Sequence, residues 1–206
     1  MAQTELISGP KKNVPIRWIP TDWIAPAKVE DIFPRSERPV EVDVGCGKGR
    51  FLLARARHHP NVNFLGIERL LGRLRKVERK VSRAQLDNVR LLRCEASYAV
   101  RYLLPTAAIT TYYIFFPDPW PKARHHDHRL FSADFLSALA RTLVSGGQVH
   151  LATDHEPYFL EIQDLLRLDH RFESVPPFEP IEEERTDFEL AFLGRRTIFR
   201  ASFRKI

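Results

Sequence analysis

The chain has 206 residues, which is enough for one well-buried α/β domain and few for two. Its hydrophobic content of 44% and charged content of 28% are those of a globular protein and exclude an intrinsically disordered chain. The formal net charge of +6 is a modest indication of a polyanionic partner.

Residues 1–38 are rich in proline and charge, and their aromatic residues Trp18, Trp23 and Phe33 follow no period, so we expect an N-terminal extension that packs by its aromatic side chains. From residue 39 to residue 206, apolar strands alternate with helical segments. Strands are predicted at Val40–Val44, Asn63–Ile67, Val89–Arg93, Ile109–Phe116, Gly147–Thr153 and, at the end, Thr197–Phe203. Helices are predicted near 49–58, 69–84, 97–103, 131–143 and 156–167. This alternation predicts a doubly wound α/β domain with a parallel sheet.

The helix predicted at 69–84 has one apolar face and otherwise carries cations. The apolar face is formed by Leu70, Leu74, Val77 and Val81. The cations are Arg69, Arg73, Arg75, Lys76, Arg79, Lys80 and Arg83. A charged helix face is usually only solvated, but this one is equally suited to face RNA phosphates, and both interpretations stay open.

An acidic residue ends or follows almost every predicted strand. The five acids are Asp43, Glu68, Glu95, Asp118 and Asp154. Because ligands of open α/β sheets bind outside the carboxyl ends of the strands, these side chains are expected to gather around one cleft. A single acid at a strand end is usually a cap or a turn residue, but five in succession favour a binding site.

A glycine loop at Asp43–Gly49 distinguishes between two kinds of cofactor. A dinucleotide fingerprint needs a small third residue, and here that position is Arg50. S-adenosylmethionine carries a sulfonium, an ammonium and a ribose diol but no phosphate, so acids around a closely approaching glycine backbone suit it. Glu68 lies where such folds place the ribose-binding acid, and Glu95 is placed to accept from the adenine amino group. The residues expected at the cofactor from this pattern are Asp43, Gly45, Gly47, Gly49, Glu68 and Glu95.

The most informative segment is Phe115–Lys122, in which an apolar strand ends in a carboxylate between two prolines. Both prolines hold φ and favour extended geometry in the residues before them, so Asp118 is expected on a stiff turn. Trp120 offers a face on which a nucleobase can stack, and Lys122 with Arg124 can contact phosphate. Taken alone, the segment is equally compatible with a proline-rich turn after a buried strand.

Residues 39–204 resemble the bacterial tRNA (guanine-N7)-methyltransferases, a branch of the class I S-adenosylmethionine-dependent methyltransferases. The resemblance rests on Asp43–Gly49, Gly66–Glu68, Phe115–His125, Ala152–Asp154 and Thr186–Glu189, of which the third and the last are the most specific. It implies a Rossmann-like, mostly parallel seven-stranded sheet with an antiparallel C-terminal strand, in a methyltransferase domain at 39–206. It also implies S-adenosylmethionine as cofactor and N7 of guanine 46 in the tRNA variable loop as target.

The same resemblance suggests which residues bind each substrate. At the cofactor it places Asp43, Glu68, Glu95 and Asp118. At the tRNA guanine it places Lys122, Asp154, Thr186, Asp187, Phe188 and Glu189. We expect Asp154 and Glu189 to hold the N1 and exocyclic N2 donors of the guanine, and Asp118 to couple cofactor and base. The chain departs from the family at residues 126–128, where further cations are common, and this predicts a weaker cationic patch.

Guanine N7 carries a free lone pair, so the predicted reaction requires no proton to be removed before attack. The protein has to align N7, the methyl carbon and the sulfur, and carboxylates suit the purine cation that forms, which makes Asp118 the candidate catalytic residue. We expect His125, His126 and His128 to contact RNA or to be structural, and we expect no metal site. In an A-form helix N7 faces the deep, narrow major groove, so a loop or a splayed base is the expected target.

Two other interpretations stay open. Asp118–Trp120 is similar to the Asp-Pro-Pro-Tyr motifs of enzymes that methylate exocyclic amino groups, although the second proline is missing here. The other alternative is a non-catalytic RNA-binding subunit with the same fold, but a degenerate cofactor site should have lost some of its acids and glycines. The sequence does not distinguish a monomer from a homodimer.

No signal for a membrane or for secretion is found in the chain. No apolar run approaches membrane-spanning length, and the N-terminus lacks the apolar core of a secretory signal. Cys46 and Cys94 are the only cysteines, too few for a disulfide framework and without metal-ligand spacing. We therefore expect a reduced, cytoplasmic protein without a membrane contact.

Overall fold

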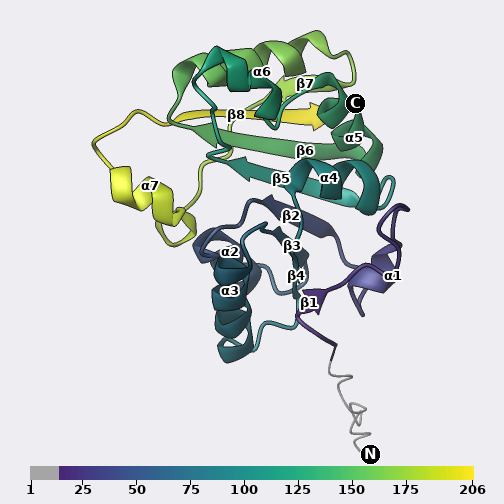
Figure 1. Cartoon of the computed structure of the whole chain (residues 1–206). Helices are drawn as coiled ribbons and strands as arrows, with labels where there is room; N and C mark the ends of the chain where they lie inside the picture. The colour runs from purple at the N-terminus through teal and green to yellow at the C-terminus, as the bar shows by residue number, and fades with distance from the viewer. Residues whose placement is uncertain (1–13) are drawn as a thin grey trace, which may run out of the picture.

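A computed structural model describes residues 14–206, except for the side chains of Ala123 and His126. It contains one eight-stranded sheet with the strand order β1-β4-β3-β2-β5-β6-β8-β7 (Figure 1). The strands are β1 Arg17–Trp18, β2 Val40–Val44, β3 Asn63–Ile67, β4 Val89–Leu92, β5 Ile109–Phe115, β6 Leu143–Thr153, β7 Phe172–Val175 and β8 Phe199–Lys205. All neighbouring strands are parallel except β8, which runs antiparallel to β6 and β7. The predicted α/β class with a mostly parallel sheet and an antiparallel C-terminal strand is confirmed.

Helices cover both faces of the sheet (Figure 1). Alternation along β3 sends Phe64 into the core beneath α2 and α3, while Leu65 and Ile67 enter the larger core on the other face, which also contains residues of α5 and α6. The helices are α1 Val29–Ile32, α2 Arg50–His58, α3 Leu71–Arg83, α4 Ala96–Tyr98, α5 Ala133–Thr142, α6 Glu156–Leu168 and α7 Asp187–Phe192. A π-helical turn spans Ala99–Leu103, and 3₁₀ turns span Ala123–His128 and Glu182–Glu184.

The strand order changes direction at β2, which pairs with β3 on one side and β5 on the other. From this point one half of the chain winds toward β1 and the other toward β7. Loops that leave the carboxyl ends of β2 and β5 therefore diverge to opposite faces. The crevice between them is where open α/β sheets bind ligands.

The sheet has one strand more than the seven expected. The additional strand, β1, comes from the segment predicted as an extension, pairs in parallel with β4 and forms one edge of the sheet. Trp18 and Phe33 are buried in the core, which confirms packing by aromatic side chains for these two residues, whereas Trp23 is exposed. The proposed division of the chain at residue 38 stays a prediction.

The apolar face predicted for the helix after Glu68 is correct for Leu74, Val77 and Val81, which are fully buried, but wrong for Leu70. Leu70 is 44% exposed because its extended backbone (φ −82°, ψ 110°) places it before the first turn of α3. β6 begins earlier than predicted, at Leu143, with an irregular pairing opposite β5. Within residues 14–206, no helix has the length and apolar character needed to cross a bilayer.

Candidate active site

The carboxyl ends of β2 to β5 surround a cavity of about 580 Å³. Its walls include Gly45 after β2, Glu68 after β3, Glu95 after β4 and Asp118 after β5. Each of these residues comes from a different strand end, so the parallel arrangement brings together acids that lie far apart in the sequence. All five strand-end acids were predicted to gather around one cleft, and the prediction is borne out for these three.

A smaller cavity of about 190 Å³ adjoins the first. The two cavities share wall residues, which are Gly45, Arg73, Phe115 and Phe116. The smaller one is also lined by Asp43 and Gly47, and by the residues 186–188 from the C-terminal part of the chain. The expected cofactor residues and part of the expected guanine-binding element therefore lie at the same edge of the sheet.

The three loop glycines have different surroundings. Gly45 and Gly47 adopt φ values of 77° and 56°, and a Cβ atom there would meet nothing within 4 Å and only the Gly45 carbonyl at 3.8 Å, respectively. At Gly49 a Cβ atom would lie 2.7 Å from Val77 Cγ1 and 2.9 Å from Leu53 Cδ1. Gly49 therefore allows α2 to pack on α3, and it lines neither cavity of the cleft. Its predicted contact with the cofactor stays a prediction.

Asp43 and Glu68 form a buried acidic pair, with exposed fractions of 5% and 6%. Glu68 Oε1 accepts a hydrogen bond from the Leu70 N–H at 2.7 Å, and Glu68 Oε2 lies 3.9 Å from Arg73 Nη1. Burial, and after it the charge of Glu68, raise the pKa of Asp43 to about 7. A cation bound beside Asp43 would stabilise its ionised form. The pair therefore fits a cationic ligand such as S-adenosylmethionine.

Glu95 lies exposed at the rim of the larger cavity and caps α4. Its two carboxylate oxygens accept hydrogen bonds from the backbone N–H groups of Ser97 at 2.9 Å and Tyr98 at 2.7 Å. The helix N-terminus therefore fixes the direction of this carboxylate. The adenine contact expected of Glu95 stays a prediction.

The loop after β5 is strained at two positions. Phe116 and Trp120 have φ values of 54° and 42°, in the left-handed region that side chains disfavour. Extended geometry was expected before Pro117 and Pro119, and for Phe116 that expectation is wrong. Asp118 lies between them as an exposed carboxylate that lines the larger cavity. Backbone strain of this kind persists only where the surrounding structure holds it.

Arg129 is one of the groups that hold this loop. Its Nε atom donates a hydrogen bond to the Pro119 carbonyl at 2.9 Å. Its guanidinium lies 4.8 Å from the centre of the Tyr158 ring and pairs with Glu161. No local pattern distinguishes Arg129 from the other arginines of the chain, so this role could not be found from the sequence.

Trp120 is partly covered by histidines, which limits the face that was expected to stack on a base. Its ring centre lies 5.1 Å from that of His128 and 5.7 Å from that of His125. Lys122 is exposed and lines neither cavity. In the described part of the chain, no three His, Cys, Asp or Glu side chains are arranged to hold a metal ion.

The beginning of α7 reaches the cleft. Thr186 Oγ1 accepts a hydrogen bond from the Glu189 N–H at 3.0 Å and so caps this helix. The ring of Phe188 lies 4.5 Å from that of Phe116, which brings α7 against the strained loop. Asp187 and Phe188 are exposed and line the smaller cavity.

Glu189 and Asp154 line neither cavity, and both are already paired with arginines. Glu189 is buried, with its Oε1 atom 2.5 Å from Arg200 Nη2 and 3.7 Å from Arg185 Nε. Asp154 pairs with Arg196. The guanine contacts expected of these two carboxylates would require them to exchange partners, and they stay predictions.

A buried polar network ties α2 to the segment that precedes α7. Arg55 Nη1 lies 3.4 Å from both carboxylate oxygens of Glu184, which is 3% exposed. Arg55 Nη2 donates to the Tyr113 hydroxyl at 2.9 Å, and this hydroxyl donates to Glu41 Oε2 at 2.9 Å. The partners are separated by as many as 129 positions in the chain, so no local pattern reveals the network.

Residues 37–190 match a family model described as "Putative methyltransferase". The chain is 31% identical over 198 residues to the tRNA (guanine-N(7)-)-methyltransferase of Nitrosomonas europaea, covering 92% of this chain and 85% of the relative. It is 38% identical over 168 residues to the protein of the same name from Halorhodospira halophila, covering 78% and 71%. The one from Thermotoga maritima is 40% identical over 145 residues, and here the match covers 70% of this chain but only 44% of the relative.

Solved methyltransferase structures share the fold at low sequence identity. The 16S rRNA methyltransferase KamB has a TM-score of 0.62 at 16% identity, covering 83% of this chain and 90% of that chain. A putative methyltransferase from Streptococcus mutans in complex with SAH has a TM-score of 0.54 at 14% identity, covering 82% and 89%. The class I methyltransferase fold expected from the sequence is confirmed.

Proposed function

The chain belongs to the tRNA (guanine-N(7)-)-methyltransferase family, and from this premise we propose that it transfers a methyl group from S-adenosylmethionine to N7 of a guanine in tRNA. The observation that carries the proposal is the junction of the two cavities at the sheet edge. The larger holds the acids of three strand ends, the smaller is lined by residues 186–188, and they share four wall residues. A methyl donor in the larger cavity and a guanine base in the smaller cavity would meet beside Phe115 and Phe116.

The larger cavity and the glycine loop suit the cofactor. S-adenosylmethionine bound there supplies an electrophilic methyl group on a sulfonium. Gly45 and Gly47 leave room for a ligand close to the backbone, and the Asp43–Glu68 pair offers negative charge to its cationic and diol groups. Glu95 and Asp118 complete the acidic wall.

The acceptor side of the reaction requires orientation rather than a base. N7 attacks with its own lone pair, so no side chain has to remove a proton, and the histidines near Trp120 need no catalytic role. As the N–C bond forms and the C–S bond breaks, positive charge passes from sulfur to the purine. The Asp118 carboxylate, which lines the larger cavity, would stabilise this shared charge in the transition state.

Cations beside the cleft suit the phosphates of tRNA. A groove of about 430 Å³ between α2 and α3 is lined by Arg50, Arg57, Lys80 and Arg83. Asp187 lines both this groove and the smaller cavity of the cleft, so the basic groove leads to the site. We expect RNA phosphates to lie along it while the target base enters the cleft.

The proposal is tested by methylation of unmodified tRNA with labelled S-adenosylmethionine, followed by separation of the nucleosides. We expect the label in 7-methylguanosine. Label in a nucleoside methylated on its exocyclic amino group would favour the alternative enzyme. Binding of cofactor and tRNA without any incorporated label would favour the non-catalytic subunit.

A matched substrate makes the test specific for the attacking atom. A tRNA carrying 7-deazaguanine at the target position keeps the N1, N2 and O6 groups but has a carbon in place of N7. We expect this tRNA to bind with unchanged affinity and to accept no methyl group. Methylation of it at the same rate would contradict N7 transfer.

A further inference from the structure

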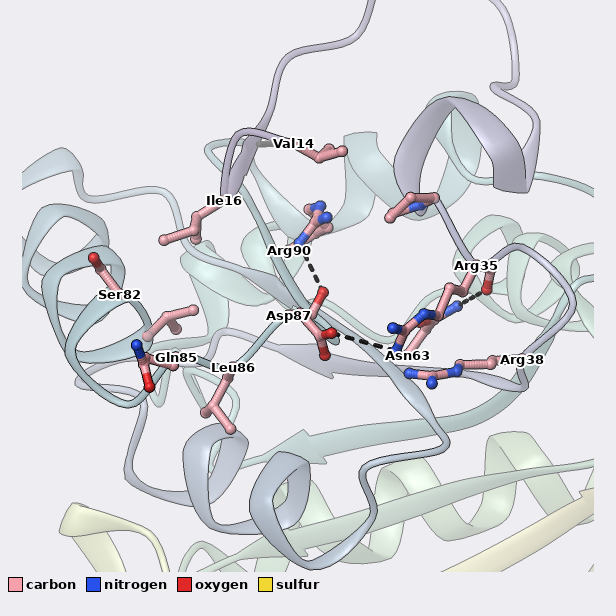
Figure 2. Close-up of a pocket in the computed structure, with 12 residues that line it drawn as sticks. Val14, Ile16, Arg35, Arg38, Asn63, Ser82, Gln85, Leu86, Asp87 and Arg90 are labelled. Carbon is pink, nitrogen blue, oxygen red and sulfur yellow. Dashed lines mark hydrogen bonds and ion pairs between the residues drawn. The ribbon is translucent and has the colours of Figure 1, made fainter. Parts of the chain in front are cut away.

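Another cavity, of about 690 Å³, lies at the amino ends of β3 and β4, away from the cleft at their carboxyl ends (Figure 2). It is lined by residues from the amino ends of two strands, Asn63 of β3 and Arg90 of β4 with the preceding Asp87, and by Arg35 and Arg38 from the segment before β2. The cleft proposed for methyl transfer opens at the carboxyl ends of the same strands. A strand of five residues separates the two sites by roughly 15 Å, so this cavity is not part of that cleft.

The cavity has an excess of positive charge. Three arginines line it, Arg35, Arg38 and Arg90, and Asp87 is the one carboxylate among its lining residues. That carboxylate lies 3.3 Å from Arg35 Nη1, and Figure 2 shows it between Arg35 and Arg90. The Arg38 guanidinium donates to a backbone carbonyl, that of Pro60, at 2.9 Å. The lining therefore carries a surplus of two positive charges.

Arg90 is the least satisfied of these cations. It is 3% exposed, and its Nη1 atom donates only to the backbone carbonyls of Asp87 and Val89, at 3.2 and 2.7 Å. Its Nε–H is buried and has no hydrogen-bond partner among residues 14–206. Desolvation lowers the pKa of Arg90, although a guanidinium stays charged at neutral pH. A buried cation without an acceptor of matching charge is costly, and an anionic ligand would offset that cost.

The remaining walls are suited to a small organic molecule. Four aliphatic residues line the cavity and make up its aliphatic side, and these are Val14, Ile16, Val81 and Leu86. Ser82 and Gln85 add polar groups (Figure 2). The volume is in the range of small-molecule sites. The burial of Arg90 favours a compact anion over an RNA backbone, which is contacted by exposed cations.

We propose that this cavity binds a small phosphorylated molecule of about nucleotide size, with its phosphate held by Arg35, Arg38 and Arg90 and its organic part against the aliphatic side. A phosphate monoester carries roughly two negative charges at neutral pH, which matches the surplus of the lining. Guanidinium groups bind such oxygens in pairs of parallel hydrogen bonds.

The test uses the full chain saturated with S-adenosylhomocysteine, so that nucleotides cannot enter the methyl-transfer cleft. Adenosine 5′-monophosphate, ribose 5-phosphate and inorganic phosphate are titrated by calorimetry, with adenosine as the probe that lacks phosphate. We expect the monophosphate to bind and adenosine not to bind. Side-chain amide signals of Asn63 and Gln85 in NMR spectra should shift during the same titration. Tighter binding of the monophosphate than of inorganic phosphate identifies an organic ligand, and equal binding identifies free phosphate as the source.

Single variants assign the binding to this cavity. Arg35→Gln and Arg38→Gln, both outside the core, should each lower the affinity for the monophosphate about tenfold. Arg90→Gln should lower this affinity further, and thermal unfolding checks that the variant is folded. Arg167→Gln removes an exposed charge of α6 and should change nothing. Unchanged affinity in all three variants, or binding of adenosine equal to that of the monophosphate, would overturn the proposal. A loss of tRNA affinity in the variants without any loss of monophosphate binding would assign these arginines to the RNA surface instead.

Discussion

The fold raises the pKa of the Asp43 carboxyl group well above its ordinary value. Its pKa of about 7 compares with 3.8 for an unperturbed aspartate, because it is buried beside Glu68. Between about pH 4 and pH 7 the folded protein therefore holds a proton that the unfolded chain has released. Stability contributed by this group is lost as the pH rises through that interval.

We expect Asp43→Asn to raise the free energy of unfolding at pH 8 by roughly 2–4 kcal/mol and to leave it nearly unchanged at pH 4. The same variant should bind S-adenosylmethionine more weakly, because it lacks the charge. Thermal unfolding at the two pH values and calorimetry with the cofactor measure both effects. In the unsubstituted protein, cofactor affinity should rise from pH 6 to pH 8 as Asp43 ionises.

Asp169 provides a control of opposite sign. Hydrogen bonds from Arg171 lower the pKa of Asp169, so its contribution to stability is present above about pH 4 and is lost in acid. Asp169→Asn should therefore destabilise the protein at pH 8 and have less effect at pH 3. If both variants changed with pH in the same direction, the assignment of the Asp43 pKa would be wrong.

Asp118 is the residue on which the proposed chemistry depends most. Asp118→Asn keeps the shape of the side chain and removes its charge, so we expect single-turnover methylation to fall by ~10²–10³. Binding of tRNA should change little, because phosphate contacts elsewhere dominate affinity. Filter binding in parallel separates the two effects. Near-normal methylation would reject Asp118 as the central residue, and an equal collapse of binding would make it a structural support.

At the scale of elements, polar contacts connect α2 to the segment that ends in α7. Glu184 is held by Arg55 and by His58, whose Nδ1 atom lies 3.0 Å from Glu184 Oε1. At the first residue of α2, Arg50 Nε donates to the Arg185 carbonyl at 3.0 Å. Through these contacts α2, which begins at the glycine loop, also positions the helix that carries Phe188 into the cleft. The glycine loop and residues 186–188 are therefore both positioned by α2.

We expect Glu184→Gln to cost ~2 kcal/mol of stability and to raise the KM for tRNA about tenfold, since it removes one of the two carboxylates beside Arg55 and loosens α7. Cofactor affinity should change much less, because residues 186–188 do not line the larger cavity, which contains Glu68, Glu95 and Asp118. Urea unfolding, calorimetry and steady-state kinetics test the three statements. Glu182→Gln changes an exposed neighbour that lines neither the basic groove nor the cleft, and it should have no effect on any of them. A matching loss of cofactor affinity would show that the network supports the whole site.

At the scale of the whole molecule, β1 makes the segment before residue 39 part of the core. Trp18 is 7% exposed in the main hydrophobic cluster, whereas Trp23, five positions on, is 44% exposed. We expect Trp18→Ala to lower the free energy of unfolding by about 3–5 kcal/mol and Trp23→Ala to change it by much less. Urea unfolding of the two variants gives the comparison. Equal effects would mean that β1 contributes little to the stability of the sheet.

Local pattern determined much of this protein. Short apolar runs placed β2 and β3 at their observed bounds, and β4 and β5 to within one residue, because the apolar character of a run is a property of neighbouring positions. The expectation that Glu68, Glu95 and Asp118 share a cleft also needed only local information. Once the sheet is parallel, all carboxyl ends lie at one edge.

Only the tertiary structure decided which partners the polar side chains have and which strand forms the edge of the sheet beside β4. Glu189 meets Arg200, Asp154 meets Arg196, and Gly49 meets Val77 only after separate elements have packed. The pairing of β1 with β4 likewise joins segments that lie far apart in the chain. The same is true of the arginine-lined cavity at the amino ends of β3 and β4. The reason is physical: a period of two or of 3.6 residues records which face of an element is buried, but not which distant charge or backbone group that face will meet.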